Sequence, residues 1–195
     1  MKTKYQDTQQ HLLDTGQAIF AAKGFSGVGL SHILQQAGVP KGSFYHYFKS
    51  KEHFGQSVLE HYFSHYLKRL ALLLDEPGVT SRSRLINYLE RWRHNYSSSE
   101  GVQDCLVVKL SAEVADLSEA MRLALRDGTA RIIQRIAVCL EAGIADGSIT
   151  SDEPQQTACI IYQQWLGASL LTKLHRDATH VDLAMQMTQQ LLSAT

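Results

Sequence analysis

The chain has 195 residues, 44% of them hydrophobic, and its 19 Lys/Arg balance 19 Asp/Glu for a formal net charge of zero. This composition, with only three prolines and no low-complexity tract, indicates a folded globular protein and excludes a disordered one. No regular succession of short strands and turns is visible, so we expect an all-α fold.

The charge is unevenly distributed along the chain. Residues 1–74 contain eight Lys/Arg against four Asp/Glu and six of the nine histidines, whereas residues 75–195 contain eleven against fifteen. A basic first third joined to an acidic remainder suggests a polyanion-binding head on a body that avoids polyanions. The excess is modest, and chance is the alternative explanation.

Neither a signal peptide nor a membrane span is expected. The opening MKTKYQDTQQHLL has basic residues without a following apolar block. Residues 154–172 carry no charge, but four glutamines interrupt them too often for a membrane span. We therefore expect a cytoplasmic protein with no membrane partner, in which this segment forms a buried or subunit-contacting helix.

The first predicted helix has an apolar stripe and ends at a glycine. The stripe consists of Leu12, Leu13, Gly16, Ile19 and Phe20. Gly24 follows Lys23, and a glycine just past the last helical residue commonly ends a helix.

Two short helices follow with a tight turn between them. The second helix repeats the helical spacing with Leu30, Ile33, Leu34 and Ala37. It ends at Gly38, and only Val39 and Pro40 precede a third helix, whose start tolerates proline. This arrangement predicts a helix-turn-helix.

The third helix has one apolar face and one polar, aromatic face. Phe44 and Phe48 lie four residues apart and share the buried face. We expect Ser50 to cap a fourth helix at 51–74, which is long enough to connect a head to a body and stops before Pro77-Gly78.

No acidic residue occurs between Lys41 and Lys51, as expected for a recognition helix that enters the major groove of DNA. The lysines would neutralise phosphates, the glycine would let the backbone approach, and the hydroxyl and imidazole groups would hydrogen-bond. Predicted DNA-binding residues are Lys41, Gly42, Ser43, Tyr45, His46, Tyr47 and Lys51. The alternative is a helix-turn-helix without DNA, with Tyr47 in the core.

Five further helices are predicted after Pro77. Their ranges are about 80–97, 104–115, 117–144, 153–175 and 180–193, and the clearest loops are 97–101 and 146–148. The last two helices carry small residues (Gly167, Ala168, Ser169) and an apolar stripe (Leu183, Met187, Leu191). They could pair with a second copy in a four-helix interface or pack inside one monomer; we favour the dimer.

The stretch GVGLSHILQQAGVPKGSFYHYFKSKEHF resembles the DNA-binding signature of the TetR family of bacterial transcriptional repressors. The resemblance implies an all-helical homodimer of about nine helices that binds a palindromic double-stranded DNA operator. It implies a DNA-binding domain at 1–50 and an effector-sensing and dimerisation domain at 51–195, in which 51–74 is the connecting helix. Val28, Gly29 and Ser31 depart from the usual cap and arginine of the second helix, which puts contacts from that helix in doubt.

The segment GVQDCLVVKLSAEVADLSEAMR carries the most informative cysteine. Asp104 can cap a helix and place Cys105 in its first turn, where the macrodipole favours a thiolate. Lys109 follows on the same face, where its positive charge would also favour the thiolate. The negative charge of Asp104 opposes both the macrodipole and Lys109. A partly buried structural thiol is the alternative.

The other two cysteines, Cys139 and Cys159, lie in apolar runs typical of inert core residues. An odd number of cysteines without a CxxC spacing argues against a disulfide framework or structural zinc.

The segments GVQDCLVVKLSAEVADLSEAMR and WLGASLLTKL resemble those of a narrower, NemR-like subgroup of the TetR family. Members of this subgroup respond to electrophiles and oxidants. The resemblance implies that Cys105 is a sensor thiol with Lys173 as its charge partner; the second cysteine expected near Ala115 is absent. A non-covalent effector, such as a small unsaturated acid, is the alternative. It would occupy an apolar pocket lined by Trp92, Tyr96, Tyr162 and Trp165.

Other functional classes have weaker support. The sequence contains no GxSxG, HExxH, P-loop or dinucleotide glycine motif. His61 and His65 have the spacing of a metal pair but no acidic neighbour in their segment, which favours a solvated or helix-packing pair. We therefore expect no enzyme, cofactor or metal. A hydrolase built on Cys105 and a sequence-independent architectural DNA protein are the less favoured alternatives.

Overall fold

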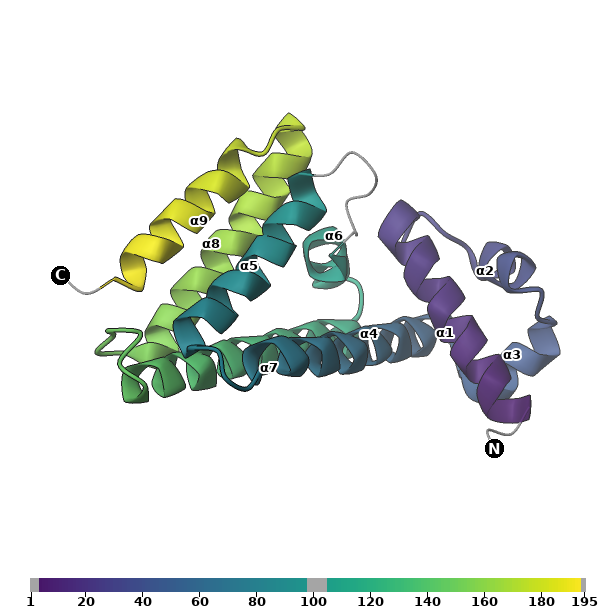
Figure 1. Cartoon of the computed structure of the whole chain (residues 1–195). Coiled ribbons are helices and arrows are strands. Elements are labelled where there is room, and N and C mark those ends of the chain that lie inside the picture. Colours follow the sequence, from purple (N-terminus) through teal and green to yellow (C-terminus); the bar gives the residue numbers. More distant parts are fainter. Residues whose placement is uncertain (1–3, 98–104, 194–195) are drawn as a thin grey trace. The chain divides into compact units, whose positions relative to one another are not determined.

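The structure, a computed structural model, describes residues 4–97 and 105–193, and folds them into nine α-helices (Figure 1). The helices are α1 (Lys4–Lys23), α2 (Leu30–Ala37), α3 (Lys41–Tyr47), α4 (Lys51–Leu74), α5 (Ser81–Ser97), α6 (Leu106–Val114), α7 (Glu119–Ala145), α8 (Pro154–His175) and α9 (Thr179–Leu191). The predicted all-α class is confirmed.

Most predicted helix boundaries agree with the structure within a few residues. The largest difference is at α1, which begins at Lys4, well before the apolar stripe that starts at Leu12. The first turns of this helix contain no aliphatic residue and only one aromatic residue, so hydrophobic periodicity gave no signal there. The predicted loop at 146–148 is present, with Gly147 at φ 74°. Residues 98–101 and Asp104 lie outside the described residues.

The chain divides into two compact units, and each of them contains part of α4 and α7. Unit 1 contains the described residues up to His65 and those from Cys105 to Gly128. Unit 2 contains the described residues from Tyr66 to Ser97 and from Thr129 to Ser193. The functional boundary expected at residue 50 stays a prediction.

The core of unit 1 is a cluster of phenylalanine rings. Phe54 of α4 lies at its centre, 5.9 Å from Phe20, 5.4 Å from Phe44 and 4.9 Å from Phe48 between ring centroids. All four side chains are at most 1% exposed. Burial of this much apolar area holds the short helix α3 against α1 and α4.

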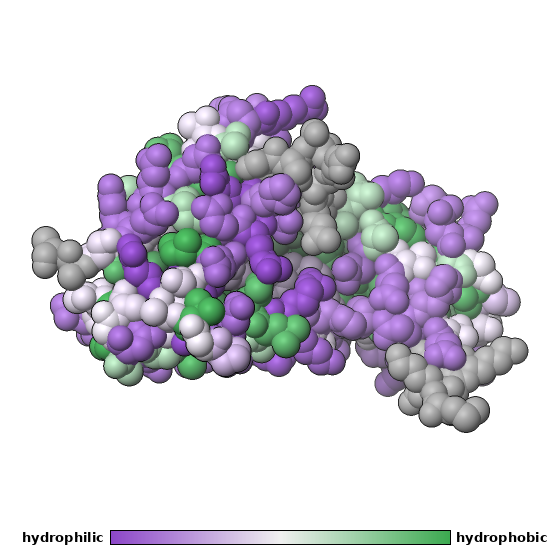
Figure 2. Space-filling model, viewed as in Figure 1, coloured by the Kyte–Doolittle hydropathy of each residue, from purple (hydrophilic) through white to green (hydrophobic). Residues whose placement is uncertain are grey.

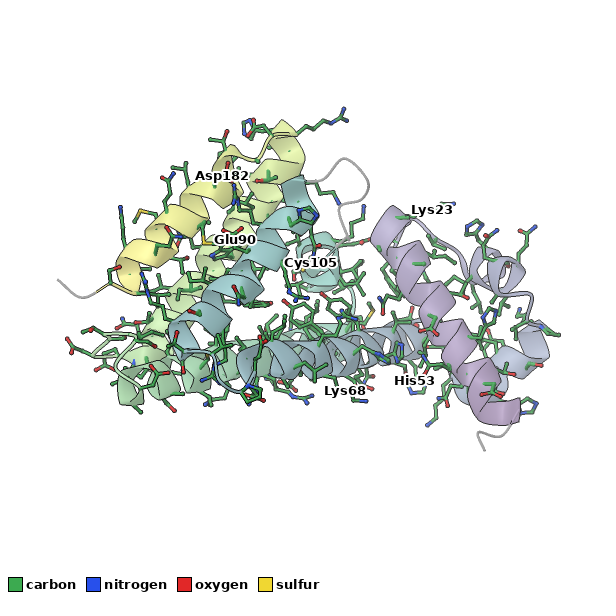
Figure 3. The ribbon with its side chains drawn as sticks, in the orientation of Figure 1. Lys23, His53, Lys68, Glu90, Cys105 and Asp182 are labelled. Atoms are coloured by element: carbon green, nitrogen blue, oxygen red, sulfur yellow. The ribbon has the colours of Figure 1, made fainter. Side chains whose placement is uncertain are left out.

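Unit 2 is built around α5, α8 and α9, which lie side by side in Figure 1. Arg93 of α5 joins two of these helices: its Nε donates to Asp182 of α9 at 2.6 Å, and its Nη1 donates to Glu90 at 3.1 Å. Figure 3 labels both acidic residues on their neighbouring helices.

The surface face drawn in Figure 2 is mainly hydrophilic, with hydrophobic residues in small separate patches. Among the described residues, no helix is both long and apolar enough to cross a membrane. The glutamines of α8 account for this result in the helix with the longest uncharged segment.

Candidate nucleic-acid interface and sensor thiol

The turn between α2 and α3 depends on one left-handed residue. Gly38 has φ 63° and ψ 27°, and its N–H donates to Gln35 O at 3.3 Å, while Val39 N–H donates to Leu34 O at 3.1 Å. A side chain would be strained in this conformation. Pro40 then precedes α3 in an extended conformation. The predicted helix-turn-helix is therefore present.

The recognition helix α3 separates its apolar and polar residues as predicted. Phe44 is 0% exposed and Phe48 is 1% exposed, with their ring centroids 5.2 Å apart. Phe48 lies just past the helix in an extended conformation, rather than within it. The two rings anchor α3 from one side.

The opposite side of α3 presents most of the predicted DNA-binding residues. Lys41, Gly42, Tyr45 and His46 are exposed, whereas Ser43 and Tyr47 are half-buried. A Cβ atom added at Gly42 would have no atom within 4 Å, so a partner molecule can approach this backbone closely. This surface combines cationic, hydroxyl and imidazole groups without an acid, as phosphate and base contacts require. DNA contact by each of these residues stays a prediction.

Lys51 is held inside unit 1. Its Nζ donates to Phe25 O at 2.7 Å and lies 4.2 Å from the centroid of the Phe25 ring. Desolvation lowers the pKa of this ammonium below its ordinary value, despite the opposing charges of Glu52 and Glu113. The predicted phosphate contact of Lys51 stays a prediction, and the structure adds an internal role for the same group.

The neighbouring helix ends agree in part with expectation. Ser50 caps α4 as predicted, because its Oγ accepts the N–H of His53 at 3.1 Å. At α2 the N-cap is Gly29, and no side chain caps the helix. The sequence departure noted at Val28, Gly29 and Ser31 is therefore accompanied by an uncapped helix start.

Cys105 is the N-cap of α6, so its predicted place in the first turn is wrong by one residue. The side chain is half-buried, and Tyr62 of α4 donates its hydroxyl to Cys105 Sγ at 3.8 Å. Figure 3 shows Cys105 at the start of α6. The capping role of Asp104 lies outside the described residues.

The side chain of Lys109 contacts the end of α1. Its backbone N–H donates to Cys105 O at 2.9 Å, but its Nζ donates to Ala22 O, at the end of α1, at 3.4 Å. The predicted effector-sensing role of Lys109 beside the thiol stays a prediction. Lys173 is exposed near the end of α8. Because Cys105 and Lys173 belong to different units, their pairing stays a prediction.

The four predicted pocket aromatics are buried in unit 2. The ring centroid of Trp92 lies 5.8 Å from that of Tyr162 and 5.7 Å from that of Trp165. The indole N–H of Trp92 donates to Ser169 Oγ at 2.9 Å, and Tyr96 is 8% exposed. These contacts place the rings in the packed interior, and a ligand-binding role for them stays a prediction.

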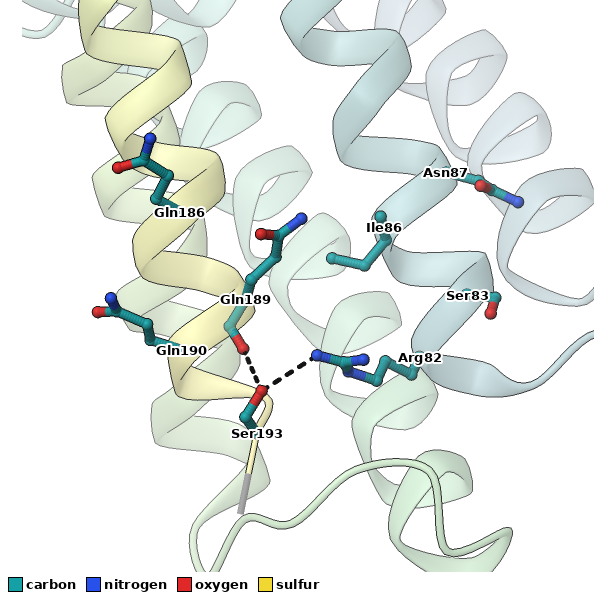
Figure 4. Close-up of a pocket in the computed structure, with 8 residues that line it drawn as sticks. All are labelled: Arg82, Ser83, Ile86, Asn87, Gln186, Gln189, Gln190 and Ser193. Carbon is teal, nitrogen blue, oxygen red and sulfur yellow. Dashed lines mark hydrogen bonds between the residues drawn. The ribbon is translucent and has the colours of Figure 1, made fainter. Parts of the chain in front are cut away.

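A polar groove runs between α5 and α9 of unit 2 (Figure 4). It has a volume of about 940 Å³ and is lined by Arg82, Ser83, Ile86, Asn87, Gln186, Gln189, Gln190 and Ser193. Arg82 Nη2 donates to Ser193 Oγ at 3.1 Å. The lining combines amides, hydroxyls, one guanidinium and the apolar side chain of Ile86. The sequence analysis missed this groove, because its lining residues are ordinary surface residues in sequence.

The remaining cysteines differ from each other. Cys139 is buried as predicted, and its Sγ donates to Ser81 O at 3.4 Å. Cys159 is half-buried rather than a core residue, and Gln163 Nε2 donates to its sulfur at 3.3 Å. An exposed face of α8 adjoins it, so the apolar sequence run around Cys159 did not indicate full burial.

His61 and His65 pack with ring centroids 4.3 Å apart, as the helix-packing interpretation predicts. An acidic neighbour does come from α1, because Asp14 Oδ1 lies 2.9 Å from His61 Nε2. Within the described ranges, no group of three or more His, Cys, Asp or Glu side chains could hold a metal ion.

These features define a class: a helical protein with a helix-turn-helix of the kind that binds DNA and further helices that form a second compact unit. Sequence profiles agree. One described as "Bacterial regulatory proteins, tetR family" matches residues 12–58, and one described as "Tetracyclin repressor-like, C-terminal domain" matches residues 81–188. The chain belongs to the TetR family of bacterial regulatory proteins.

Individual relatives agree over nearly the full chain. The HTH-type transcriptional repressor NemR of Escherichia coli K12 is 40% identical over 188 residues, covering 96% of this chain and 94% of NemR. The repressor DhaR of Mycobacterium sp. GP1 is 33% identical over 89% of this chain and 86% of DhaR. The crystal structure of reduced E. coli NemR has a TM-score of 0.92 and 41% identity, covering 97% and 98% of the two chains. The resemblance to the NemR-like subgroup and the assignment as a regulator rather than an enzyme are confirmed.

Proposed function

We propose that this protein is a repressor that binds a palindromic DNA operator as a homodimer and leaves it when a reactive electrophile or oxidant modifies Cys105. The observation that carries the DNA-binding part is α3, with Phe44 and Phe48 buried and Lys41, Tyr45 and His46 exposed. Relatives named as repressors support the direction of regulation.

The α3 surface is suited to the major groove in both charge and shape. A seven-residue helix can place its first turns against base edges while cationic side chains contact phosphates. One head reads one half-site, and a two-fold dimer reads a palindrome whose half-sites are about one helical turn apart.

The homodimer is supported by an uncovered apolar face in unit 2. On α9, Leu183 is 50% exposed, Met187 47% and Leu191 37%. On α8, Leu170 and Leu174 are exposed, and Gly167 lies on the same side. Apolar residues at helical spacing on two neighbouring helices fit a four-helix interface with a second copy.

The sensor role of Cys105 is supported by its accessibility and by the relative with a structure described as a reduced form. With a maleimide, the Cys105 thiolate attacks one carbon of the C=C bond. A sulfur–carbon bond forms, the π bond breaks, and the neighbouring carbon takes a proton from solvent to replace the proton that the thiol released. The added group, attached at the start of α6, would lie against Tyr62 of α4.

The test is operator binding, measured by fluorescence anisotropy with duplexes from the promoter region of the protein's own gene. N-ethylmaleimide should weaken binding by wild type about 5- to 150-fold, the usual range of coupling between two sites. Cys105→Ser should bind without responding, and Cys159→Ser should respond like wild type. An unchanged response in Cys105→Ser would refute the role of this thiol.

A non-covalent effector is the second candidate, because the α5–α9 groove offers a polar site in unit 2. In that case a small unsaturated acid would release the operator from Cys105→Ser as well as from wild type. Catalysis by Cys105 is disfavoured by membership of a family of transcription regulators.

A further inference from the structure

Helix α6 carries Cys105 at one end and an acidic residue that contacts the DNA-binding head at the other. Glu113 lies eight residues after Cys105, which corresponds to about 12 Å along a helix. The intervening side chains Leu106, Val107 and Leu110 are buried in unit 1. A short helix that is packed along its length moves as one body, so a shift at its start reaches its end.

The Glu113 carboxylate holds two consecutive backbone N–H groups of the turn between α1 and α2. Its Oε2 accepts from Phe25 N–H at 3.0 Å, and its Oε1 accepts from Ser26 N–H at 2.5 Å. Gly24 makes this approach possible: it has φ 77°, and a Cβ atom there would lie 2.8 Å from Oε2. These are charge-assisted hydrogen bonds, which are stronger and more directional than neutral ones.

The pKa of Glu113 agrees with this arrangement. Burial alone would raise it, but the N–H groups of Phe25 and Ser26, the Ser26 side chain and the charge of Lys109 outweigh burial and keep the pKa below its ordinary value. The carboxylate is therefore ionised near neutral pH, as the contact requires.

Two lysines complete the connection. Lys51, the first residue of α4, donates to Phe25 O at 2.7 Å, so the Phe25 residue is held by Glu113 at its N–H and by Lys51 at its C=O. Lys109 donates to Ala22 O in the last turn of α1. The contacts join α6 to the residues that lead directly into α2 and the recognition helix.

From this geometry we infer that Glu113 and Lys51, with the Phe25 and Ser26 backbone, form a latch that couples Cys105 to the orientation of the helix-turn-helix. The inference rests on the proposed function of Cys105. The latched state is the one that binds DNA, and modification of Cys105 shifts α6 and weakens the latch. Such coupling requires that the modification favour the unlatched state in free energy, and bulk between α6 and Tyr62 provides that preference.

The first experiment compares Glu113→Gln with wild type in the operator assay, with and without N-ethylmaleimide. Glutamine keeps the size but loses the charge and places an NH₂ group against an N–H donor. We expect weaker binding without the reagent, and a reagent effect reduced to less than about one-third of the wild-type ratio. A merely structural role would lower affinity and leave the ratio unchanged, which would overturn the latch.

Glu119→Gln is the matched control. Glu119 is an exposed acid at the start of α7 whose partner is Arg122 on the same helix, at 2.6 Å. This variant should keep both the affinity and the reagent effect of wild type.

A second measurement does not depend on DNA release. Backbone hydrogen exchange of Phe25 and Ser26 is compared between unmodified protein and protein alkylated at Cys105, in a Cys159→Ser background with the adduct verified by mass spectrometry. The latch predicts exchange about tenfold faster at these two amides. If Cys105 does not alkylate, Cys105→Phe replaces the adduct and Cys105→Ser is its control.

The outcomes separate the two proposals. If wild type stays bound to its operator in the presence of the reagent, the sensor function is refuted. If the reagent weakens operator binding by Glu113→Gln by the same factor as in wild type, the latch is refuted and the sensor function stands. Equal exchange at Phe25 and Ser26 with and without bulk at Cys105 also refutes the latch.

Discussion

At the residue scale, the surroundings of a thiol decide its chemistry. Cys139 and Cys105 are both free cysteines, but Cys139 is buried and Cys105 is half-buried at a helix start. Burial raises the pKa of the Cys139 thiol from its ordinary value of 9.0 to about 11, and the charges of Arg84 and Arg135 only partly oppose it. Since the thiolate is the nucleophile, Cys139 is poorly suited to sensing.

The raised pKa of Cys139 predicts that a thiol reagent labels this cysteine more slowly than an ordinary one. At pH 7.5, the thiolate fraction of Cys139 should be about a hundredfold below that of an ordinary thiol, because each pKa unit is a factor of ten. Peptide mass spectrometry of protein treated briefly with N-ethylmaleimide should find Cys139 unmodified while half-buried Cys159 reacts. Equal labelling of Cys139 and Cys159 would contradict the raised pKa of Cys139.

The same pKa has a consequence for stability. Because the folded-state pKa is raised, the contribution of the Cys139 thiol to stability is fully present below pH 9 and is lost as the pH rises toward about 11. Cys139→Ala should show a smaller loss of unfolding free energy over this pH interval than wild type, measured by urea unfolding.

At the element scale, α3 depends on its anchors. Seven residues are too few for an independent helix, so its stability comes from tertiary packing. Phe44 supplies most of this packing, through ring contacts to Phe48 and Phe54. Lys41, Gly42, Tyr45 and His46 lie on the exposed side of α3, where a partner molecule can reach them.

Phe44→Ala should therefore lower the free energy of unfolding by about 3–5 kcal/mol, because it removes a fully buried ring and leaves a cavity. Tyr45→Ala removes a 49% exposed ring whose centroid lies 5.5 Å from that of Phe44, so it should lower stability by no more than about 1.5 kcal/mol while weakening operator binding. Urea unfolding and anisotropy measure the two effects. Equal destabilisation by both substitutions would contradict this division of roles.

At the scale of the whole molecule, the proposed function requires two heads. The exposed apolar residues of α8 and α9 are the part of unit 2 whose exposure a second copy would relieve. A single head contacts one half-site and loses the additive contribution of the second.

Met187→Glu should therefore produce a monomer of 21.8 kDa in sedimentation velocity, because a charge is buried without a partner in the dimer. Its operator affinity should fall more than about tenfold. Gln189→Glu, on the side of the same helix that faces the α5–α9 groove, should remain a dimer. A Met187→Glu protein that stays dimeric would place the interface elsewhere.

The sequence by itself determined the helices, the helix-turn-helix and the family. Periodic apolar residues, Gly24 and Gly38 as stops and the dense motif from Lys41 to Phe54 are local signals, and local backbone preferences and side-chain spacing are sufficient to interpret them. The burial of Phe44 and Phe48 followed from spacing alone, because residues four apart share a helix face.

Only the tertiary structure decided which partner each polar group has. Lys109 and Glu113 look like ordinary surface charges in sequence, yet they reach the end of α1 and the turn after it, which lie about 87 residues away along the chain. Lys51 likewise turns toward Phe25. Periodicity specifies the face on which a side chain lies, but the partner is set by which distant segment packs on that face, and this depends on the arrangement of all the helices at once.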